Sequence, residues 1–396
     1  MLTTHVPIQA LQVFDSAQLS TFLRVTRLSF LEPIINNNND IKARIFLPIR
    51  YGGAGLRLAQ QHHSAAVVGS LTRNKESINT IFQDEARIVQ ENERYIQSAI
   101  DLFETTLGVD NLDREQLEKE QKAMSERISK TTYQNLLGRQ PSAKIMQCAN
   151  GSGFSMLPGQ YDIAMLSDED FSGAMTVYLG LDRIIPRTHI VNHVDHTNHE
   201  NQHDASILSC GRCCELTQRH NQVVDYLHFA AKANRIDSIK NPRQYMFAIQ
   251  HQGHEELLQP FDLHTQVAQG NAGNHRVIGY DVTVIDPIHC GIYRNSTVEQ
   301  AYINKAREKT TKYAAVIQRH NAQGGIQLQF HPLVFSAYGA ASKSALEAIE
   351  RLFDQTKNKK VMSIVLRKIS LRILVHSGRA VRKYFGRGFG LPLAVV

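Results

Sequence analysis

The sequence lacks the features that would place it in or across a membrane. No apolar run approaches the roughly 18 to 20 residues that a bilayer-spanning helix needs. The segment from Met1 to Ala17 has neither the basic start nor the apolar centre of a secretory signal peptide. We therefore expect a protein with no membrane span that is nuclear or cytoplasmic and is not secreted.

Cysteine is also scarce, with five residues in a chain of 396. An odd number of cysteines in a long chain without a secretion signal does not form a disulfide framework, so reduced thiols or metal ligands are the better interpretation. Hydrophobic residues make up 42% of the chain, which is enough for two or three domains with their own cores.

Acidic residues are nearly absent from the C-terminal end. From Arg351 onward the chain has eleven Lys or Arg residues and one acid, Asp354, while the net charge of the whole chain is +7. We interpret residues 354–396 as a basic tail on a nearly neutral body, and the simplest partner for such a tail is the phosphate backbone of nucleic acid. Two alternatives are an interfacial amphipathic helix over residues 361–375 and a plain solvated tail.

Helical patterns with few breakers fill the N-terminal part of the chain. Residues 81–103 and 112–137 place Glu, Lys and Gln on their outer faces, which predicts an all-α region over residues 1–145. Gly52, Gly53 and Gly55 lack the basic and hydroxyl partners of a phosphate-binding loop, so we interpret them as a tight turn.

Histidine and cysteine crowd the next segment, residues 146–215, which otherwise has the texture of a linker. Two residues separate His193 from His196, and two separate Cys210 from Cys213. These four side chains could supply a closed tetrahedral site for Zn²⁺. The alternative is that the histidines are exposed to solvent and hold no metal.

Two aspartates are associated with strand-like segments further along the chain. Val282 and Val284 alternate with Asp281 and Thr283, which is the period of a half-buried strand. Asp262 lies 19 positions before Asp281. A hairpin that turns near residues 270–273 would bring the two carboxylates together.

A helix, a strand and another helix are predicted after this strand. The helix covers residues 298–319, the strand residues 326–335 and the last helix residues 345–353. The first helix carries three lysines on one face, Lys305, Lys309 and Lys312. Aspartates near turns and lysines at helical spacing also occur on ordinary solvated surfaces, so this pattern alone does not decide the function.

Several short sequence motifs occur in the same order as in one known family. They are Arg219-His220-Asn221, Pro260-Phe261-Asp262-Leu263, Asp281-Val282-Thr283-Val284, Lys309 to Tyr313 and Pro332-Leu333-Val334-Phe335. Over roughly residues 206–352 the chain resembles the restriction-like endonuclease domain found downstream of the polymerase in site-specific non-LTR retrotransposons. The resemblance implies an α+β chain, in which an N-terminal all-α region precedes a central mixed sheet flanked by helices.

The resemblance also implies an activity and a site. Residues 216–353 would be a nuclease domain that nicks DNA, with Asp262 and Asp281 holding Mg²⁺ or Mn²⁺. A lysine usually stands two residues after the second acid, where this chain has Thr283, so Lys309 or Lys312 on the helix would take that place. A hard cation held by carboxylates neutralises the charge that builds on phosphoryl oxygens during cleavage.

Further expectations come from the same resemblance. Arg219 and His220 would lie near phosphate, Lys305 would be another nucleic-acid contact, and the partners would be DNA and the RNA of the element. A zinc knuckle precedes the nuclease in this family, and residues 1–145 would correspond to the connector after the polymerase. No Asp-Asp dipeptide occurs in the chain, so we expect no reverse transcriptase activity.

Two departures from the family pattern leave alternatives open. Phe261 separates the proline from the aspartate, which tend to be adjacent in the family, and the gap to Asp281 is longer than usual. The chain could therefore be an active endonuclease or a catalytically inactive nucleic-acid-binding remnant of the same fold. A structural or interaction protein recruited by a host is the third alternative.

Overall fold

The chain forms two compact units, Met1–Ala143 and Lys144–Val396. A computed structural model describes residues 7–82, 85–107, 121–139, 142–150, 166–181, 208, 215–251, 254–269, 274–288, 296–323, 326–354 and 359–385. The boundary between the units lies within two residues of the one expected after residue 145. No helix among these residues is long and apolar enough to span a membrane.

The described residues of the first unit form helices joined by turns and loops, with no strand among them. Its α-helices are α1 (Ile8–Val25), α2 (Glu32–Asn36), α3 (Asn39–Ile45), α4 (Ala59–Ile81), α5 (Ala86–Leu107) and α7 (Gln121–Leu137). Phe103 of α5 is fully buried in a cluster with residues of α4 and α7. Gly52 and Gly55 have φ values of 79° and 84°, which only glycine adopts without strain, so the expected tight turn is confirmed.

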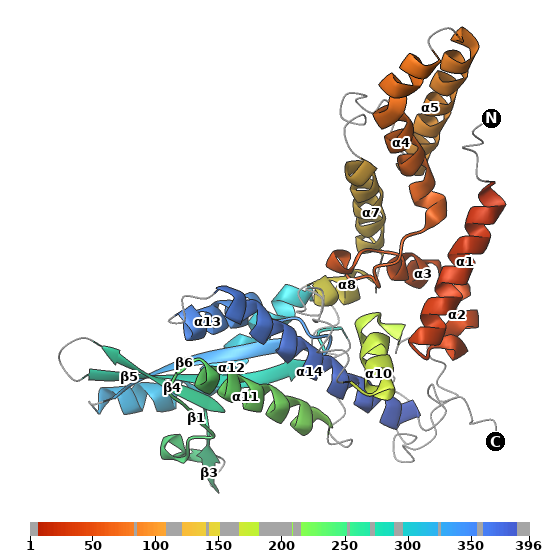
Figure 1. The fold of residues 1–396 in the computed structure, drawn as a ribbon. Coiled ribbons are helices and arrows are strands. Elements are labelled where there is room, and N and C mark those ends of the chain that lie inside the picture. The colour runs from red at the N-terminus through yellow and green to blue at the C-terminus, as the bar shows by residue number, and fades with distance from the viewer. Residues whose placement is uncertain are drawn as a thin grey trace. The chain divides into compact units, whose positions relative to one another are not determined.

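The second unit contains the sheet (Figure 1). Its helices are α8 (Ser142–Asn150), α10 (Asp168–Tyr178), α11 (Glu215–Ala233), α12 (Val298–Ala322), α13 (Lys343–Asp354) and α14 (Lys359–Phe385). Its strands are β1 (Ser238–Lys240), β2 (Phe247–His251), β3 (His254–Leu258), β4 (Leu263–Gln269), β5 (Asn274–Ile285) and β6 (Gln327–Ser336). The chain thus combines helices with a small mixed sheet, which is compatible with the expected α+β class.

Four of the strands form one mixed sheet in the order β1-β4-β5-β6, and β2 pairs with β3 in a separate hairpin. β4 and β5 are antiparallel neighbours, as the predicted hairpin requires, and its turn at residues 270–273 lies outside the described residues. β5 and β6 are parallel, and α12 lies between them in the sequence. Ser342 accepts a hydrogen bond from the amide of Ala345 (3.1 Å), the helix cap that starts α13.

The two faces of the sheet have separate cores, and β5 contributes to both. Tyr280 and Val282 pack with α11, α13 and α14 on one face. Val277 packs with Tyr313 and Ile317 of α12 on the other. Side chains alternate along a strand, so Asp281 shares the face of Val277 and is directed toward α12.

The predicted basic tail is wrong over residues 359–385, which form α14. Val365, Ile369 and Ile373 recur every four residues on this helix and are buried in the core. This apolar stripe packs against α11 and the sheet, while the basic side chains occupy other positions of the same helix. The net charge of this segment suggested a tail because net charge does not report the helical spacing of the apolar residues between the basic ones.

The linker predicted over residues 146–215 is also wrong in part, because it contains α10. Ser167 caps this helix by accepting from the amide of Asp170 (3.1 Å), and residues 172–178 are buried. α10 packs closely on α14, where Gly173 lies against the backbone of Gly378. Residues 146–150 belong to α8, in which Cys148 is buried.

Candidate active site

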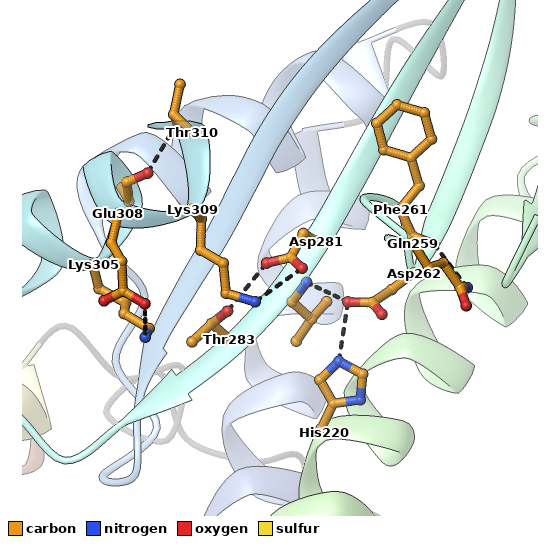
Figure 2. Close-up of polar contacts among 12 residues, drawn as sticks. His220, Gln259, Phe261, Asp262, Asp281, Thr283, Lys305, Glu308, Lys309 and Thr310 are labelled. Atoms are coloured by element: carbon orange, nitrogen blue, oxygen red, sulfur yellow. Dashed lines mark hydrogen bonds and ion pairs between the residues drawn. The ribbon is translucent and has the colours of Figure 1, made fainter. Parts of the chain in front are cut away.

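Asp281 and Lys309 form an ion pair between β5 and α12 (Figure 2). Lys309 Nζ lies 3.1 Å from Asp281 Oδ1, and the hydroxyl of Thr283 donates to Asp281 Oδ2 at 3.2 Å. The side chain of Asp281 is 7% exposed and that of Lys309 is 22% exposed. One turn further along α12, Tyr313 is buried against the sheet, which holds the helix so that Lys309 reaches the strand.

Asp262 is fixed beside the same strand by its backbone and its side chain. Its amide donates to the carbonyl of Tyr280 (2.9 Å), and its Oδ2 accepts from the amide of Val282 (2.7 Å). These two residues flank Asp281, so the hairpin brings the two acids to neighbouring positions, as the sequence predicts. The carboxylate of Asp262 is held on the backbone of the strand that carries Asp281.

Phe261 has a structural reason to stand between Pro260 and Asp262. Its ring is fully buried and points away from the carboxylate of Asp262 (Figure 2). It lies over Gly279 of β5, where any Cβ atom would overlap the ring. Phe261 therefore anchors the chain to the core one residue before Asp262. A lone glycine within a strand pattern is a known signal of such close approach.

His220 of α11 completes the cluster. Its Nε2 lies 3.0 Å from Asp262 Oδ2, and its Nδ1 lies 3.1 Å from Asn221 Oδ1. The sequence motif Arg219-His220-Asn221 indicated this helix, which begins at Glu215, four residues before the motif. The contact with Asp262 was not predicted, because 42 residues separate the partners and no spacing rule links them.

The site perturbs two ionisations. Burial raises the pKa of Asp281, and the charge of Asp262 raises it further, although Lys309 and Thr283 oppose the shift. Burial alone would lower the pKa of His220, but its hydrogen bond to Asp262 and the charge of that acid outweigh burial and raise it. Acids and bases with such shifts, gathered at one place, are typical of functional sites.

The structure distinguishes among the three lysines of the α12 stripe. Lys309 contacts Asp281, whereas Lys305 pairs with Glu308 on its own helix at 2.6 Å. Lys312 Nζ lies 5.5 Å from the centre of the Tyr313 ring. Lys309 is thus the lysine for which the structure shows contact with a site acid.

Arg219 lies in the interior, which contradicts its expected place near phosphate. It is 2% exposed, and its guanidinium donates to Ser377 Oγ (2.9 Å) and to the carbonyl of Leu208 (3.0 Å). Arg219 immediately precedes His220 on α11, and adjacent helical residues do not share a face, so the two side chains point in different directions. Arg219 holds α11 to α14 and is not a surface contact for DNA.

No protein-family model and no curated protein matches the sequence. The functional interpretation therefore rests on the site itself and on the order of the sequence motifs.

The two carboxylates suit a hard divalent cation. Mg²⁺ is commonly held by one or two carboxylates, with water and substrate phosphate completing its coordination. An ionised carboxylate has about four lone-pair positions, so the bonds that Asp262 and Asp281 make within the protein leave room for an ion. The described residues contain no group of three or more His, Cys, Asp and Glu side chains arranged to hold a metal.

The predicted zinc ligands cannot be placed in the same way. His193, His196, Cys210 and Cys213 all lie outside the described residues. The zinc knuckle stays a prediction.

Proposed function

We propose that the second unit is a divalent-metal-dependent DNA endonuclease domain of the restriction-like type, derived from a retrotransposon polyprotein. The observation that carries this proposal is the meeting of Asp262, Asp281 and Lys309, which come from the bend before β4, from β5 and from α12. The mixed sheet between α12 on one face and α11, α13 and α14 on the other supports the proposed fold.

Lys309 takes the place of the strand lysine that this chain lacks. Thr283 stands at that strand position, and its hydroxyl bonds the same carboxylate as the Lys309 ammonium. Lys309 of α12 thus places its positive charge beside the carboxylate of Asp281, where a lysine at position 283 would place it. A charge fixed there before reaction stabilises negative charge on a phosphoryl group without reorganisation.

The two acids are each matched by one basic group. Asp281 contacts Lys309, and Asp262 contacts His220, whose raised pKa favours the protonated ring. This pairing offsets the negative charge of two neighbouring carboxylates. Bound Mg²⁺ or Mn²⁺ would be held by Asp262 and Asp281 and would supply positive charge to the oxygens of the scissile phosphate.

Nicking of supercoiled plasmid by the intact chain in Mg²⁺ tests the proposal. We expect open-circular product from the wild type and none from Asp281→Asn. Lys309→Met should be slower by about 10²-fold, the effect of losing one preorganised charge or donor. Lys312→Met, three residues further along α12, is the matched control and should nick normally. Equal nicking by wild type and Asp281→Asn would rule out this site.

A nucleic-acid-binding remnant without catalysis is the second candidate. It is favoured by the hydrogen bonds that Asp281 already accepts within the protein. Lys309 donates to one of its carboxylate oxygens and Thr283 to the other. Under this alternative, wild type and Asp281→Asn would bind DNA equally, neither would nick it, and added salt would weaken binding in both. A structural protein recruited by a host would show no salt-sensitive binding.

A further inference from the structure

A groove with a cavity of about 770 Å³ lies between α10, α11 and α14, outside the acid pair. One wall consists of side chains of α11 and the other of basic side chains of α14, two helices that pack together in the second unit (Figure 1). The walls contribute amides from Gln218, Asn221 and Gln222 and charges from Lys368, Arg372 and Arg379. Gln218 and Gln222 are four residues apart on α11, as are Lys368 and Arg372 on α14, and Arg379 follows two turns later, so each set lies along one side of its helix.

The groove begins next to the candidate active site. Asn221 lines the groove, and its Oδ1 lies 3.1 Å from Nδ1 of His220. The other nitrogen of the same ring contacts Asp262. One histidine therefore separates the end of the groove from the acid that would hold the metal.

The basic wall is ordered by contacts within the protein. The guanidinium of Arg372 lies over the ring of Tyr226, 4.2 Å from its centre, and donates to the carbonyl of Lys368 at 3.3 Å. An arginine stacked in this way loses little further freedom when it binds phosphate.

Acidic groups in the groove are each matched by a cation. Asp170 pairs with Arg379 at 2.6 Å, and Asp225 pairs with Lys240. His376, which also lines the groove, contacts Glu215 at 2.9 Å. Among the charged side chains that line the groove, the three cations Lys368, Arg372 and Arg379 outnumber the two acids Asp170 and Asp225.

We propose that this groove binds a single strand of DNA and leads it to the acid pair, an inference that rests on the proposed function. Its volume of about 770 Å³ is that of a small-molecule site, which is too small to enclose a duplex. From Lys368 to Arg379 the wall extends about 16 Å, which matches about five nucleotides of a stacked strand. Lys368 and Arg372 contact phosphates, and the α11 amides contact base edges.

Fluorescence anisotropy with a labelled single-stranded oligonucleotide, in EDTA so that no cleavage occurs, tests this assignment on the full chain. The double variant Lys368→Gln and Arg372→Gln should bind about tenfold more weakly, and the slope of log K against log salt should fall by about 1.4, for two lost contacts. Gln222→Glu, an exposed change that leaves the packing of α14 intact, should weaken binding in the same direction.

The matched control is Lys343→Gln with Arg351→Gln, two exposed charges of α13 outside the groove, and it should bind like the wild type. Equal binding by the groove variants, an equal loss in the control, or stronger competition by duplex DNA would overturn the groove assignment while leaving plasmid nicking untouched. If the wild type bound no oligonucleotide at any salt concentration yet nicked plasmid, the groove alone would be wrong. If it did neither, the proposed function would also fail.

Discussion

Asp262 and Asp281 are held by different kinds of contact, and this difference governs how the site responds to pH. Asp281 is nearly buried and bonds Lys309, whereas Asp262 bonds a backbone amide and His220. Strand alternation and the expected hairpin predicted that the two acids lie near each other, whereas helical spacing put Lys309 on one face with Lys305 and Lys312 without choosing among the three. His220 could not be paired with Asp262, because that contact depends on how α11 packs across the edge of the sheet.

Replacing His220 with glutamine should change the pH dependence of stability. The folded protein raises the pKa of His220 above its ordinary value of 6.5, so the protonated ring stabilises the fold. That contribution is fully present below 6.5 and is lost as the pH rises through the higher folded value. Thermal unfolding without metal should show a larger loss of Tm in His220→Gln at about pH 6 than at about pH 9. An equal loss at both would contradict the His220–Asp262 pairing.

Gly279 should be needed for both stability and activity. A methyl group there would overlap the ring of Phe261 and displace the residue before Asp262. We expect Gly279→Ala to lower the free energy of unfolding by about 1–3 kcal/mol and to slow plasmid nicking. Gly138→Ala is the control, because its Cβ would make an ordinary contact of 3.6 Å with the carbonyl oxygen of Asn135. Urea denaturation that gave the same result for both variants would show that Phe261 does not depend on Gly279.

At the scale of elements, patterns with a clear period were predicted best. The strand containing Asp281, the helix containing Lys309 and the helix after Ser342 lie where alternation, helical spacing and a cap residue placed them. α14 was predicted as a tail because the prediction rested on the excess of basic residues and not on the apolar stripe from Val365 to Ile373, which is buried. α10 was missed, although Ser167 before three acidic residues is a helix-start signal.

The crossing of α10 and α14 should be sensitive to small additions in an unequal way. A Cβ on Gly378 would overlap the backbone of Gly173, whereas a Cβ on Gly173 would lie 3.1 Å from Gly378. Both helices gain about 1 kcal/mol of intrinsic propensity from alanine, so the difference between the variants isolates the contact. We expect Gly378→Ala to be less stable than Gly173→Ala by about 1–3 kcal/mol in urea denaturation. The reverse order would contradict this helix packing.

At the scale of the whole molecule, the chain divides into a helical unit and a unit that carries every site residue the structure describes. The boundary near residue 145 could be predicted because composition changes there. The division of the second unit into linker, nuclease and tail could not be sustained, because α14 packs on both α10 and α11. Those contacts join residues about 200 positions apart, which a local pattern does not report.

Titration of the intact chain with Mn²⁺ tests whether Asp262 and Asp281 hold one metal ion between them, and it does not rely on activity. The free ion is measured by electron paramagnetic resonance. We expect Asp262→Asn and Asp281→Asn each to bind one ion fewer than the wild type, because Mn²⁺, like Mg²⁺, prefers carboxylate oxygens. Lys312→Met should bind as many ions as the wild type. Unchanged Mn²⁺ binding in both aspartate variants would contradict a metal held between Asp262 and Asp281.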